Sequence, residues 1–432
     1  MSFNFAETPE EVDTITEEAI ERADTLVEQL VSSSPGTTAD TLLPLDEIGA
    51  ALADSFGRGG FMAFVHPDPA VREAGRRAEE RLQKWAVDLV FRDDLYRAVK
   101  EFADSDEAKA LSGEPARLLE FTLRDLRKAG HELEPEARDE AKRIAARLVE
   151  LSVAFDRNVA EWQDHLTVST EDLDGLPDDY IARLQLGEVE GTYKVTMAYP
   201  DVVPFLENAR RRDLRRELAY KFNTRAVEAN TPLLKEAVEL RRRTAELFGL
   251  PSWAHYVMDE KMAKEPGRVS DFYDRLTPPL TDKGRLELDV MAKLLEQDTG
   301  ESIVQPWDWR YYDTQIRRRD FGVDPHEVAA YFPLDQVLDG MLEITGEVFG
   351  VEYRVLDDQP VWHSDVTAWA IVDGASGEDI ATVFMDLFPR EGTYSHAAAF
   401  PLVAGRREDD GGYRHPISAI VANLTKPTPE RP

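Results

Sequence analysis

The sequence predicts a mainly α-helical protein whose last part is a small antiparallel β-sheet. Apolar residues recur at helical spacing through roughly the first 350 residues. After residue 360 the pattern changes to short apolar runs separated by turn residues. The composition agrees, because 42% apolar and 31% charged residues are typical of a globular protein with a substantial core.

The helices are predicted from apolar stripes and from their start and stop signals. A long helix is expected over 144–162, and a shorter one over 214–222. The residues that form the long stripe are Ile144, Leu148, Leu151, Phe155, Val159 and Trp162. A third helix should begin at Thr231, an N-cap residue followed by proline, and end near Gly249. Asp324 precedes a proline in the same way and predicts a further helix start.

The strands are predicted from apolar and β-branched runs after residue 360. Val366–Val372 and Ile380–Phe388 read as a hairpin around a turn at Asp373–Asp379. Tyr394–Val403 and Ile417–Thr425 are two further strand candidates. We therefore expect a short antiparallel sheet after a long helical body.

Composition excludes several classes of protein. The chain has no cysteine, so disulfide scaffolds, thiolate zinc sites, iron–sulfur clusters and cysteine nucleophiles are excluded. The formal net charge is −33 and only 13 residues are lysine, which argues against a nucleic-acid partner. Acidity of this degree is typical of proteins from a cytoplasm near salt saturation. The acidic start shows no signal-peptide pattern, and no apolar run is long enough for a membrane span, so we expect a halophilic cytoplasmic protein.

Common catalytic motifs are absent from the sequence. It contains no dinucleotide or nucleotide phosphate loop, no Gly-x-Ser-x-Gly and no EF-hand loop. Two histidines at i and i+4 on a helix can hold zinc, but no pair here has that spacing. The histidines are His66, His131, His165, His255, His326, His363, His396 and His415. Spacing alone therefore gives no metal site and no catalytic residues.

Several segments carry a resemblance to a known family. Asp386–Phe400 reads D-L-F-P-R-E-G-T-Y-S-H-A-A-A-F, and Ile420–Thr428 reads I-V-A-N-L-T-K-P-T. Val361–Val366, Trp307–Tyr312 and Leu250–Val257 add W-H-S-D-V, W-D-W-R-Y-Y and L-P-S-W-A-H-Y-V. In these segments the sequence resembles the thimet oligopeptidase/neurolysin/oligopeptidase A family of zinc metallopeptidases. The resemblance extends over essentially the whole chain and is most specific in the last hundred residues.

The resemblance implies a fold and a function. The fold would be a neurolysin-like helical body around a deep channel, with a small antiparallel sheet belonging to an incomplete zincin catalytic domain. Residues 1–200 would form an N-terminal helical domain. Residues 201–432 would form the first part of the catalytic domain, with helices to about 360 and then the sheet. The family function is zinc-dependent endopeptidase hydrolysis of short cytoplasmic peptides.

The sequence departs from the family where the metal should bind. In the family, the T-K-P-T segment is followed by a helix with H-E-F-G-H, and neither this motif nor a later glutamate ligand is present among the 432 residues. Metal-assisted hydrolysis needs a polarised water and a base to deprotonate it. We therefore expect an N-terminal portion that binds no zinc and is inactive alone. Zinc would belong to the full-length enzyme, and a separate C-terminal polypeptide is a candidate partner.

Substrate handling is the role that the resemblance leaves to this chain. Zincins bind a peptide as an added strand along a sheet edge. The resemblance places Tyr394, His396, Ala397 and Ala398 at that edge, where the two alanines would allow close approach of a peptide. The alternative interpretation of this segment is an ordinary strand with tightly packed alanines. The alternative function is a non-enzymatic peptide-binding or scaffolding remnant.

Neighbouring polar residues have structural interpretations. We expect His363 to be a hydrogen-bonding histidine that supports the sheet. Arg390 and Glu391 are interpreted as either a pair that stabilises a turn or a substrate contact, and we favour the turn pair because proline and glycine flank them. Asp386 is interpreted as a salt-bridge or solvated carboxylate. None of these residues is assigned a catalytic or metal-binding role.

Overall fold

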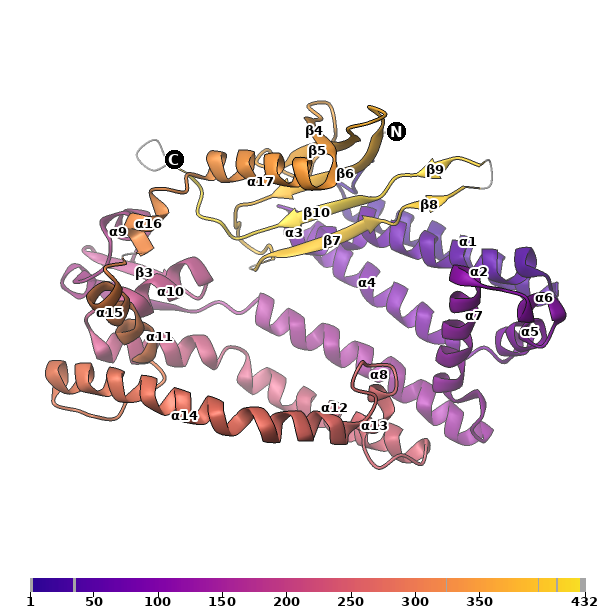
Figure 1. The fold of residues 1–432 in the computed structure, drawn as a ribbon, viewed down its shortest axis with the longest axis horizontal. Coiled ribbons are helices and arrows are strands. Elements are labelled where there is room, and N and C mark those ends of the chain that lie inside the picture. Colours follow the sequence, from indigo (N-terminus) through magenta and orange to yellow (C-terminus); the bar gives the residue numbers. More distant parts are fainter. Residues whose placement is uncertain (1–2, 34–35, 324, 395, 409–410, 428–432) are drawn as a thin grey trace. The chain divides into compact units, whose positions relative to one another are not determined.

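The computed structural model describes residues 3–33, 36–323, 325–394, 396–408 and 411–427 (Figure 1). The chain divides into two compact units, each assembled from stretches that are separated in sequence. Unit 1 comprises residues 1–160, 231–256 and 344–424, and unit 2 comprises residues 161–230, 257–343 and 425–432.

Unit 1 contains most of the helices. They are α1 (Pro9–Ser32), α2 (Thr38–Ser55), η1 (Phe56–Gly60), α3 (Met62–Val65), α4 (Pro69–Val90), α5 (Asp93–Ala103), α6 (Asp106–Lys109), α7 (Gly113–Leu126), η2 (Arg127–His131) and α8 (Pro135–Ala160), together with most of α12 (Val227–Leu247) and part of α13 (Trp253–Met258). Their starts follow local chemistry. The Thr8 hydroxyl accepts from the Glu11 amide before α1, Thr37 and Asp40 form a capping box on α2, and the Asp68 carboxylate caps α4.

A five-stranded sheet of unit 1 has the order β4-β5-β6-β10-β7. Its strands are β4 (Val351–Val355), β5 (Thr367–Asp373), β6 (Asp379–Asp386), β7 (Ala398–Val403) and β10 (Ile417–Val421). A separate two-stranded ribbon pairs β8 (Arg406–Arg407) with β9 (Tyr413–Arg414). The sheet is antiparallel except that β10 runs parallel to β6. β10 inserts between β6 and β7 and pairs antiparallel with β7, so β7 runs opposite to both β6 and β10.

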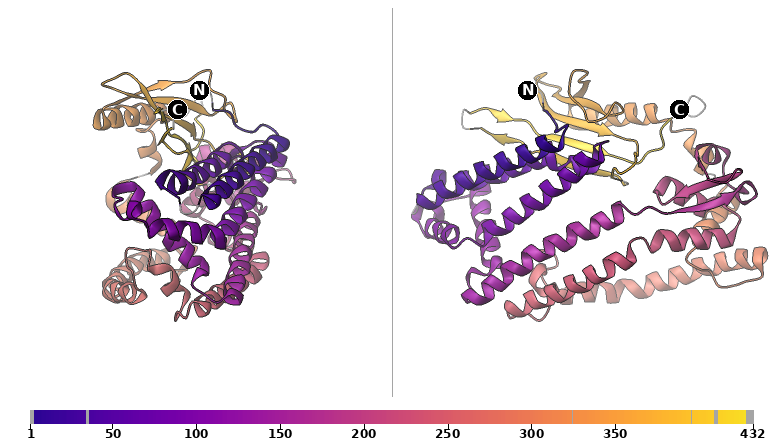
Figure 2. Two further views of the ribbon diagram at one scale, coloured as in Figure 1. Left: turned by 90° about the vertical axis from the view of Figure 1, so that its right-hand side faces the viewer. Right: turned by 180° about the vertical axis from the view of Figure 1, so that it is seen from behind.

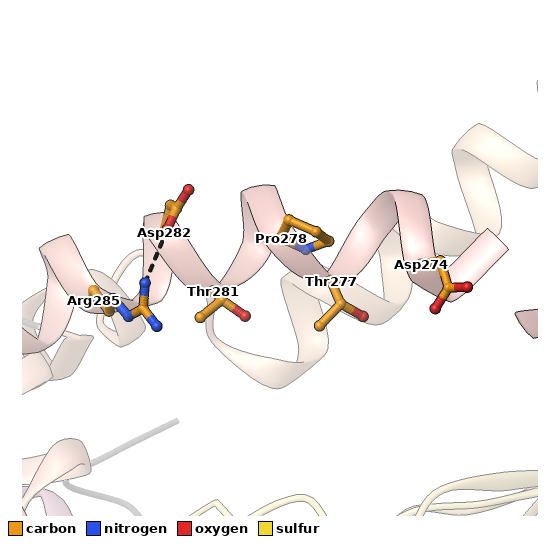
Figure 3. A pocket seen from close by; sticks show the side chains of 6 residues that line it. All are labelled: Asp274, Thr277, Pro278, Thr281, Asp282 and Arg285. Carbon is orange, nitrogen blue, oxygen red and sulfur yellow. Dashed lines mark hydrogen bonds and ion pairs between the residues drawn. The ribbon is translucent and has the colours of Figure 1, made fainter. Parts of the chain in front are cut away.

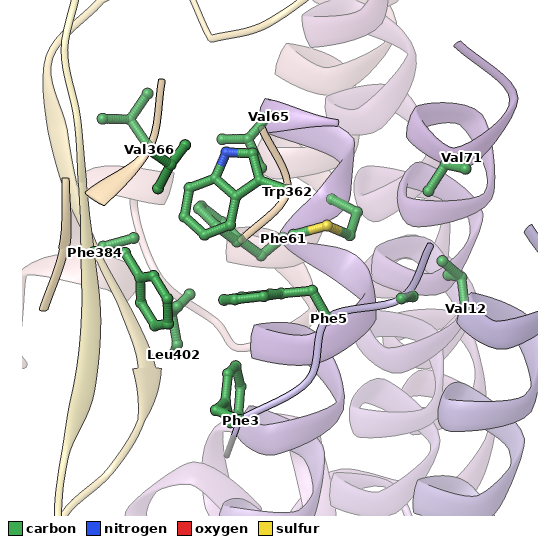
Figure 4. Packing of buried hydrophobic residues seen from close by; sticks show 14 of the residues in the cluster. Phe3, Phe5, Val12, Phe61, Val65, Val71, Trp362, Val366, Phe384 and Leu402 are labelled. Atoms are coloured by element: carbon green, nitrogen blue, oxygen red, sulfur yellow. The ribbon is translucent and has the colours of Figure 1, made fainter. Parts of the chain in front are cut away.

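Helices α1, α3 and α4 lie under the sheet (Figure 2), and one of the hydrophobic clusters of unit 1 fills the space between them. Figure 4 shows Phe5 and Trp362 between the sheet residue Phe384 and the helix-side residue Phe61. Phe5 and Trp362 meet edge to face at 4.8 Å between ring centroids, and Phe5 meets Phe384 at 5.0 Å. The Gln359 amide also donates to the Phe3 carbonyl at 2.7 Å. The start of the chain is therefore part of the hydrophobic core beneath the C-terminal sheet.

Unit 2 combines a second sheet with long helices. Its elements are β1 (His165–Ser169), η3 (Thr170–Leu173), α9 (Asp178–Arg183), β2 (Gln185–Leu186), β3 (Thr192–Thr196), α10 (Tyr199–Asn208), α11 (Arg212–Asn223), α14 (Pro266–Thr299), α15 (Trp309–Phe321), α16 (Pro325–Ala329) and much of α17 (Leu334–Phe349). The strands form an antiparallel sheet of order β1-β3-β2. Arg212 and Arg215 of α11 both bind the fully buried Asp308, which tightens the contact between α11 and the start of α15.

The mainly helical fold with a late sheet is confirmed, and the expected hairpin corresponds to β5 and β6. The long stripe lies on α8, apart from Trp162, which follows its end. The third helix begins earlier than expected, because Asn230 already donates to the Ala226 carbonyl and closes a turn before Thr231. The strands over 165–196 were not predicted, and neither was β4, which lies where helices were expected. The expectation of a purely antiparallel sheet is wrong, because β10 pairs parallel with β6. Asp324 lies outside the described residues.

No helix within the described ranges carries an apolar stretch that is long enough to cross a membrane.

Candidate functional site

The predicted site residues lie at the start of β7, which forms one edge of the five-stranded sheet. Ala398 is the first residue of β7, and Ala397 and His396 directly precede it. Tyr394 lies further back in the connection from β6. Ser395, which belongs to the same segment, lies outside the described residues. The structure thus places the predicted segment beside an edge strand.

The hydrogen bonds of β10 define which peptide groups point toward β7. The Thr382 amide donates to the Pro416 carbonyl at 3.0 Å, and the Ala422 amide donates to the Asp386 carbonyl at 2.7 Å. Peptide groups alternate in direction along a strand. Even-numbered residues of β10 therefore face β6, and odd-numbered residues face β7.

The same alternation defines the outer side of β7. Ala398 and Phe400 lie opposite odd-numbered residues of β10, so their peptide groups face that strand. The peptide groups of Ala399 and Pro401 therefore face away from the sheet. Pro401 has no N–H to lose on this side, which explains why the edge strand tolerates a proline. Ala399 offers both a donor and an acceptor at the edge, and Pro401 offers an acceptor.

Small or short side chains surround these outward peptide groups. Ala397, Ala399 and Pro401 are exposed, and Ala398 is half-buried. His396 is exposed at the start of the edge. No bulky side chain of β7 itself stands over its outward peptide groups between Ala397 and Pro401, so another backbone could approach them.

Tyr394 anchors the segment before the edge to helix α3. Its amide donates to the Phe64 carbonyl at 2.7 Å. Its ring packs edge to face against Phe64 and Phe400, with centroids 6.2 and 5.6 Å away. The Tyr394 ring therefore contributes to the hydrophobic core that supports the edge.

Asp386, at the end of β6, is 1% exposed and binds two partners. Its carboxylate accepts hydrogen bonds from both terminal nitrogens of Arg390, at 2.6 and 2.5 Å, and from the indole N–H of Trp362, at 2.8 Å. The salt-bridge interpretation of Asp386 is confirmed. The interpretation of Arg390 and Glu391 as a turn pair is wrong, because Arg390 turns back to the buried carboxylate four residues earlier and Glu391 is exposed.

His363 has the structural role that was predicted. Its Nδ1 accepts the Asp365 amide at 3.1 Å, and its carbonyl accepts the Val366 amide at 3.0 Å. Together these bonds close the turn that leads into β5.

A family comparison gives the context of this edge. The family model described as peptidase family M3 matches residues 205–432, slightly more than half of the chain, and includes the whole five-stranded sheet. The chain belongs to peptidase family M3. The resemblance seen in the sequence motifs is confirmed.

Curated relatives extend the similarity to the whole M3 chain. It is 29% identical to a thimet-like oligopeptidase of Dictyostelium discoideum, covering 100% of this chain and 67% of the relative. It is 27% identical to saccharolysin of Saccharomyces cerevisiae, with 99% and 63% covered. Oligopeptidase A of Escherichia coli is 26% identical, with 94% and 62% covered. The chain thus spans about two thirds or less of the length of these M3 relatives.

The described residues do not assemble a zinc site. Zinc requires three or four nitrogen, oxygen or sulfur ligands within bonding distance. Within the ranges that the structure describes, no group of three or more histidine, aspartate or glutamate side chains is placed to hold a metal ion. The zinc expected for an M3 peptidase therefore does not fit a ligand set on these residues.

A surface hollow in unit 2 is unrelated to the β7 edge. All the side chains that line it come from α14 (Figure 3). They are Asp274, Thr277, Pro278, Thr281, Asp282 and Arg285. Arg285 pairs with Asp282 at 3.2 Å along the same helix. These residues do not form the converging constellation that a catalytic site needs.

Proposed function

We propose that this M3 chain holds short, extended peptides by adding them as a strand along the outer edge of β7, as the peptide-holding portion of a zinc-dependent oligopeptidase. The observation that carries the proposal is the outward peptide group of Ala399 on an edge strand, with the exposed residues Ala397 and Pro401 two positions to either side. Strand addition uses main-chain hydrogen bonds and therefore accepts many peptide sequences.

The geometry of the edge sets how a peptide would pair. A bound strand would donate to and accept from Ala399, and Ala397 before it would extend the pairing. Pro401 can accept but cannot donate, so pairing ends there. This short register suits an extended oligopeptide and gives modest affinity, because each main-chain hydrogen bond contributes only about 0.5–1.5 kcal/mol net.

Catalysis requires groups that these residues do not supply. The 432 residues contain no H-E-x-x-H sequence, and the M3 relatives that are named oligopeptidases are longer than this chain. We propose that zinc and the general base come from a further polypeptide segment, that the 432 residues alone do not hydrolyse peptides, and that the complete enzyme acts on cytoplasmic peptides.

Helix α17 supports the need for a further segment. Val337, Met341, Ile344 and Val348 recur at i, i+4, i+7 and i+11, which places them on one face. All four are exposed, from 37% at Met341 to 69% at Val348. Apolar faces of this kind are usually covered by another segment or partner.

Peptide binding can be tested at the edge itself. We expect Ala399→Pro to weaken binding of a short labelled peptide about tenfold or more, because it removes the outward donor without removing a bond to β10. Fluorescence anisotropy would measure the dissociation constant.

The matched control is Val355→Pro on β4, the opposite edge strand. Val355 also faces outward, because its neighbour Leu356 donates inward to Ala368. Equal affinity of the two variants, or no binding by the wild type, would contradict the proposal.

Activity provides a second test. We expect the purified 432-residue chain to leave a quenched fluorescent peptide intact with or without added zinc. Activity should appear when a polypeptide that carries the H-E-x-x-H segment of an M3 relative is added. Peptide binding without any gain of activity would favour the non-enzymatic peptide-binding function instead.

A further inference from the structure

The connection from β6 to β7, residues 387–397, begins at a buried ion pair. Asp386 and Arg390 bind through two parallel N–H···O bonds, and the Arg390 side chain is 15% exposed. Arg390 Nη2 also lies 3.3 Å from the Val65 carbonyl at the end of α3. A bidentate guanidinium–carboxylate pair fixes orientation as well as distance.

The same arginine organises the turn that follows. Its amide and its carbonyl both bind the Thr393 hydroxyl, at 3.2 and 2.8 Å. The next residue, Tyr394, donates to the Phe64 carbonyl at 2.7 Å. Gly392 lies between Arg390 and Thr393 and has φ +74°, and a side chain at this position would collide with the Arg72 guanidinium. The connection is thus held against the last residues of α3 just before β7 begins.

We infer that the Asp386–Arg390 pair is a positioning device for the peptide-binding edge. It fixes the turn at residues 390–394 on α3 and thereby sets where Ala397 and Ala399 present their peptide groups. The inference rests on the proposed function where it concerns peptide binding. The mechanical part, in which the pair controls the local order of the edge, stands on the contacts alone.

The chemistry of the pair favours positioning over a contribution to global stability. A buried ion pair loses on desolvation much of what its attraction gains, so its net contribution to stability is small. What it supplies is geometry, because Arg390 reaches Asp386 and Val65 at once. Lysine keeps the charge but cannot form two parallel bonds.

Arg390→Lys separates geometry from charge. We expect amide hydrogen exchange at Tyr394 and Ala398 to become at least about tenfold faster in the full 432-residue variant, while the Phe384 amide in β6 is unchanged. Peptide affinity should fall about tenfold, and the thermal unfolding midpoint should change little. The control is Arg354→Lys on β4, the opposite edge strand, which alters an exposed ion pair in which one terminal nitrogen of Arg354 donates to both carboxylate oxygens of Asp379.

Each outcome decides the inference. Faster exchange confined to residues 390–399 supports it, and unchanged exchange overturns it. Faster exchange spread evenly over the sheet also overturns it, because the pair would then be a general structural contact. If the wild type binds no peptide, the proposed function fails, and the exchange comparison alone decides whether the pair positions the edge. Asp386→Asn keeps an acceptor for Trp362 but leaves the Arg390 charge unpaired, so we expect the local effect together with a lower thermal unfolding midpoint.

Discussion

His66 follows α3 and is part of the same region of unit 1. Its Nδ1 accepts the Asp68 amide at 3.1 Å, which leaves the proton of the neutral ring on Nε2. Burial lowers the pKa of His66 below its ordinary value, and the nearby Arg72 guanidinium acts in the same direction. Protonation would place a second proton on Nδ1 and break the bond to Asp68.

This residue predicts a loss of stability in acid. Because the pKa of His66 is lower in the folded than in the unfolded chain, the unfolded chain binds more protons as the pH falls below about 6.5. We expect the wild type to lose more unfolding free energy than His66→Gln between about pH 7 and about pH 5.5. Urea titration at both pH values measures the difference. His255→Gln, at an exposed site, should follow the wild type, and parallel behaviour of all three proteins would contradict this account.

Single-residue roles near the edge were only partly predictable. The motif resemblance led to Ala397 and Ala398, which lie just before and at the start of the edge strand β7, but not to Ala399. Asp386 and Arg390 are four residues apart in the sequence, which could have suggested their pairing. However, i, i+4 pairing is a rule for helices, and here a strand ends at Asp386, so the spacing alone does not predict the contact. Two further contacts fix the pair, and both come from other parts of the chain. The Trp362 indole donates to Asp386, and the Val65 carbonyl accepts from Arg390.

At the scale of elements, the backbone of η1 packs closely against the backbone of β7 at Gly57. A side chain at Gly57 would collide with the backbone carbonyl of Leu402. Leu402 is fully buried and lies where the register between β7 and β10 shifts. The close approach of these two backbones holds the far end of the edge strand.

Gly57→Ala should therefore destabilise the chain. We expect a loss of about 1–3 kcal/mol, because the added methyl group must push two backbones apart. Chemical denaturation measures this change. Gly49→Ala is the control, since a methyl group there meets nothing within 4 Å and replaces a glycine inside α2. We expect that control to gain up to about 1 kcal/mol. Similar effects of both substitutions would show that the close approach is unimportant.

Elements with a regular pattern were the predictable ones. Helix α8 and the β5–β6 hairpin follow from apolar spacing and turn residues. The small sheet of unit 2 was missed, although Leu166 and Val168 alternate with polar residues in β1 and could have indicated a strand. A strand as short as β1 contains too few residues to show a clear alternation, and its pairing with β3 is a tertiary contact.

At the scale of the whole molecule, the large negative net charge is expected to make stability depend on salt. A formal net charge of −33 gives strong self-repulsion at low ionic strength, and salt shortens the range of that repulsion. We expect the thermal unfolding midpoint to rise between about 0.1 M and about 2 M potassium chloride. Differential scanning calorimetry measures it, with sucrose of equal osmolality as the control. A midpoint that stays constant or falls with salt would contradict the high-salt interpretation.

The sequence by itself determined the class of fold, the family and the acidic character of the molecule. Helical periodicity, turn chemistry and charge are local or additive properties, so they can be read without knowing which segments meet. The family motifs also pointed to Tyr394–Ala398, a segment that reaches only the first residue of β7 and does not include Ala399.

Only the tertiary structure decided how that segment is presented. The outward direction of the Ala399 peptide group depends on the insertion of β10 between β6 and β7. The support beneath it depends on Phe5 from the start of the chain packing against Trp362 and Phe384 near its end. Such contacts join residues that are hundreds of positions apart, and no local pattern encodes them, because their energy comes from burial and hydrogen bonds formed only when the chain is folded.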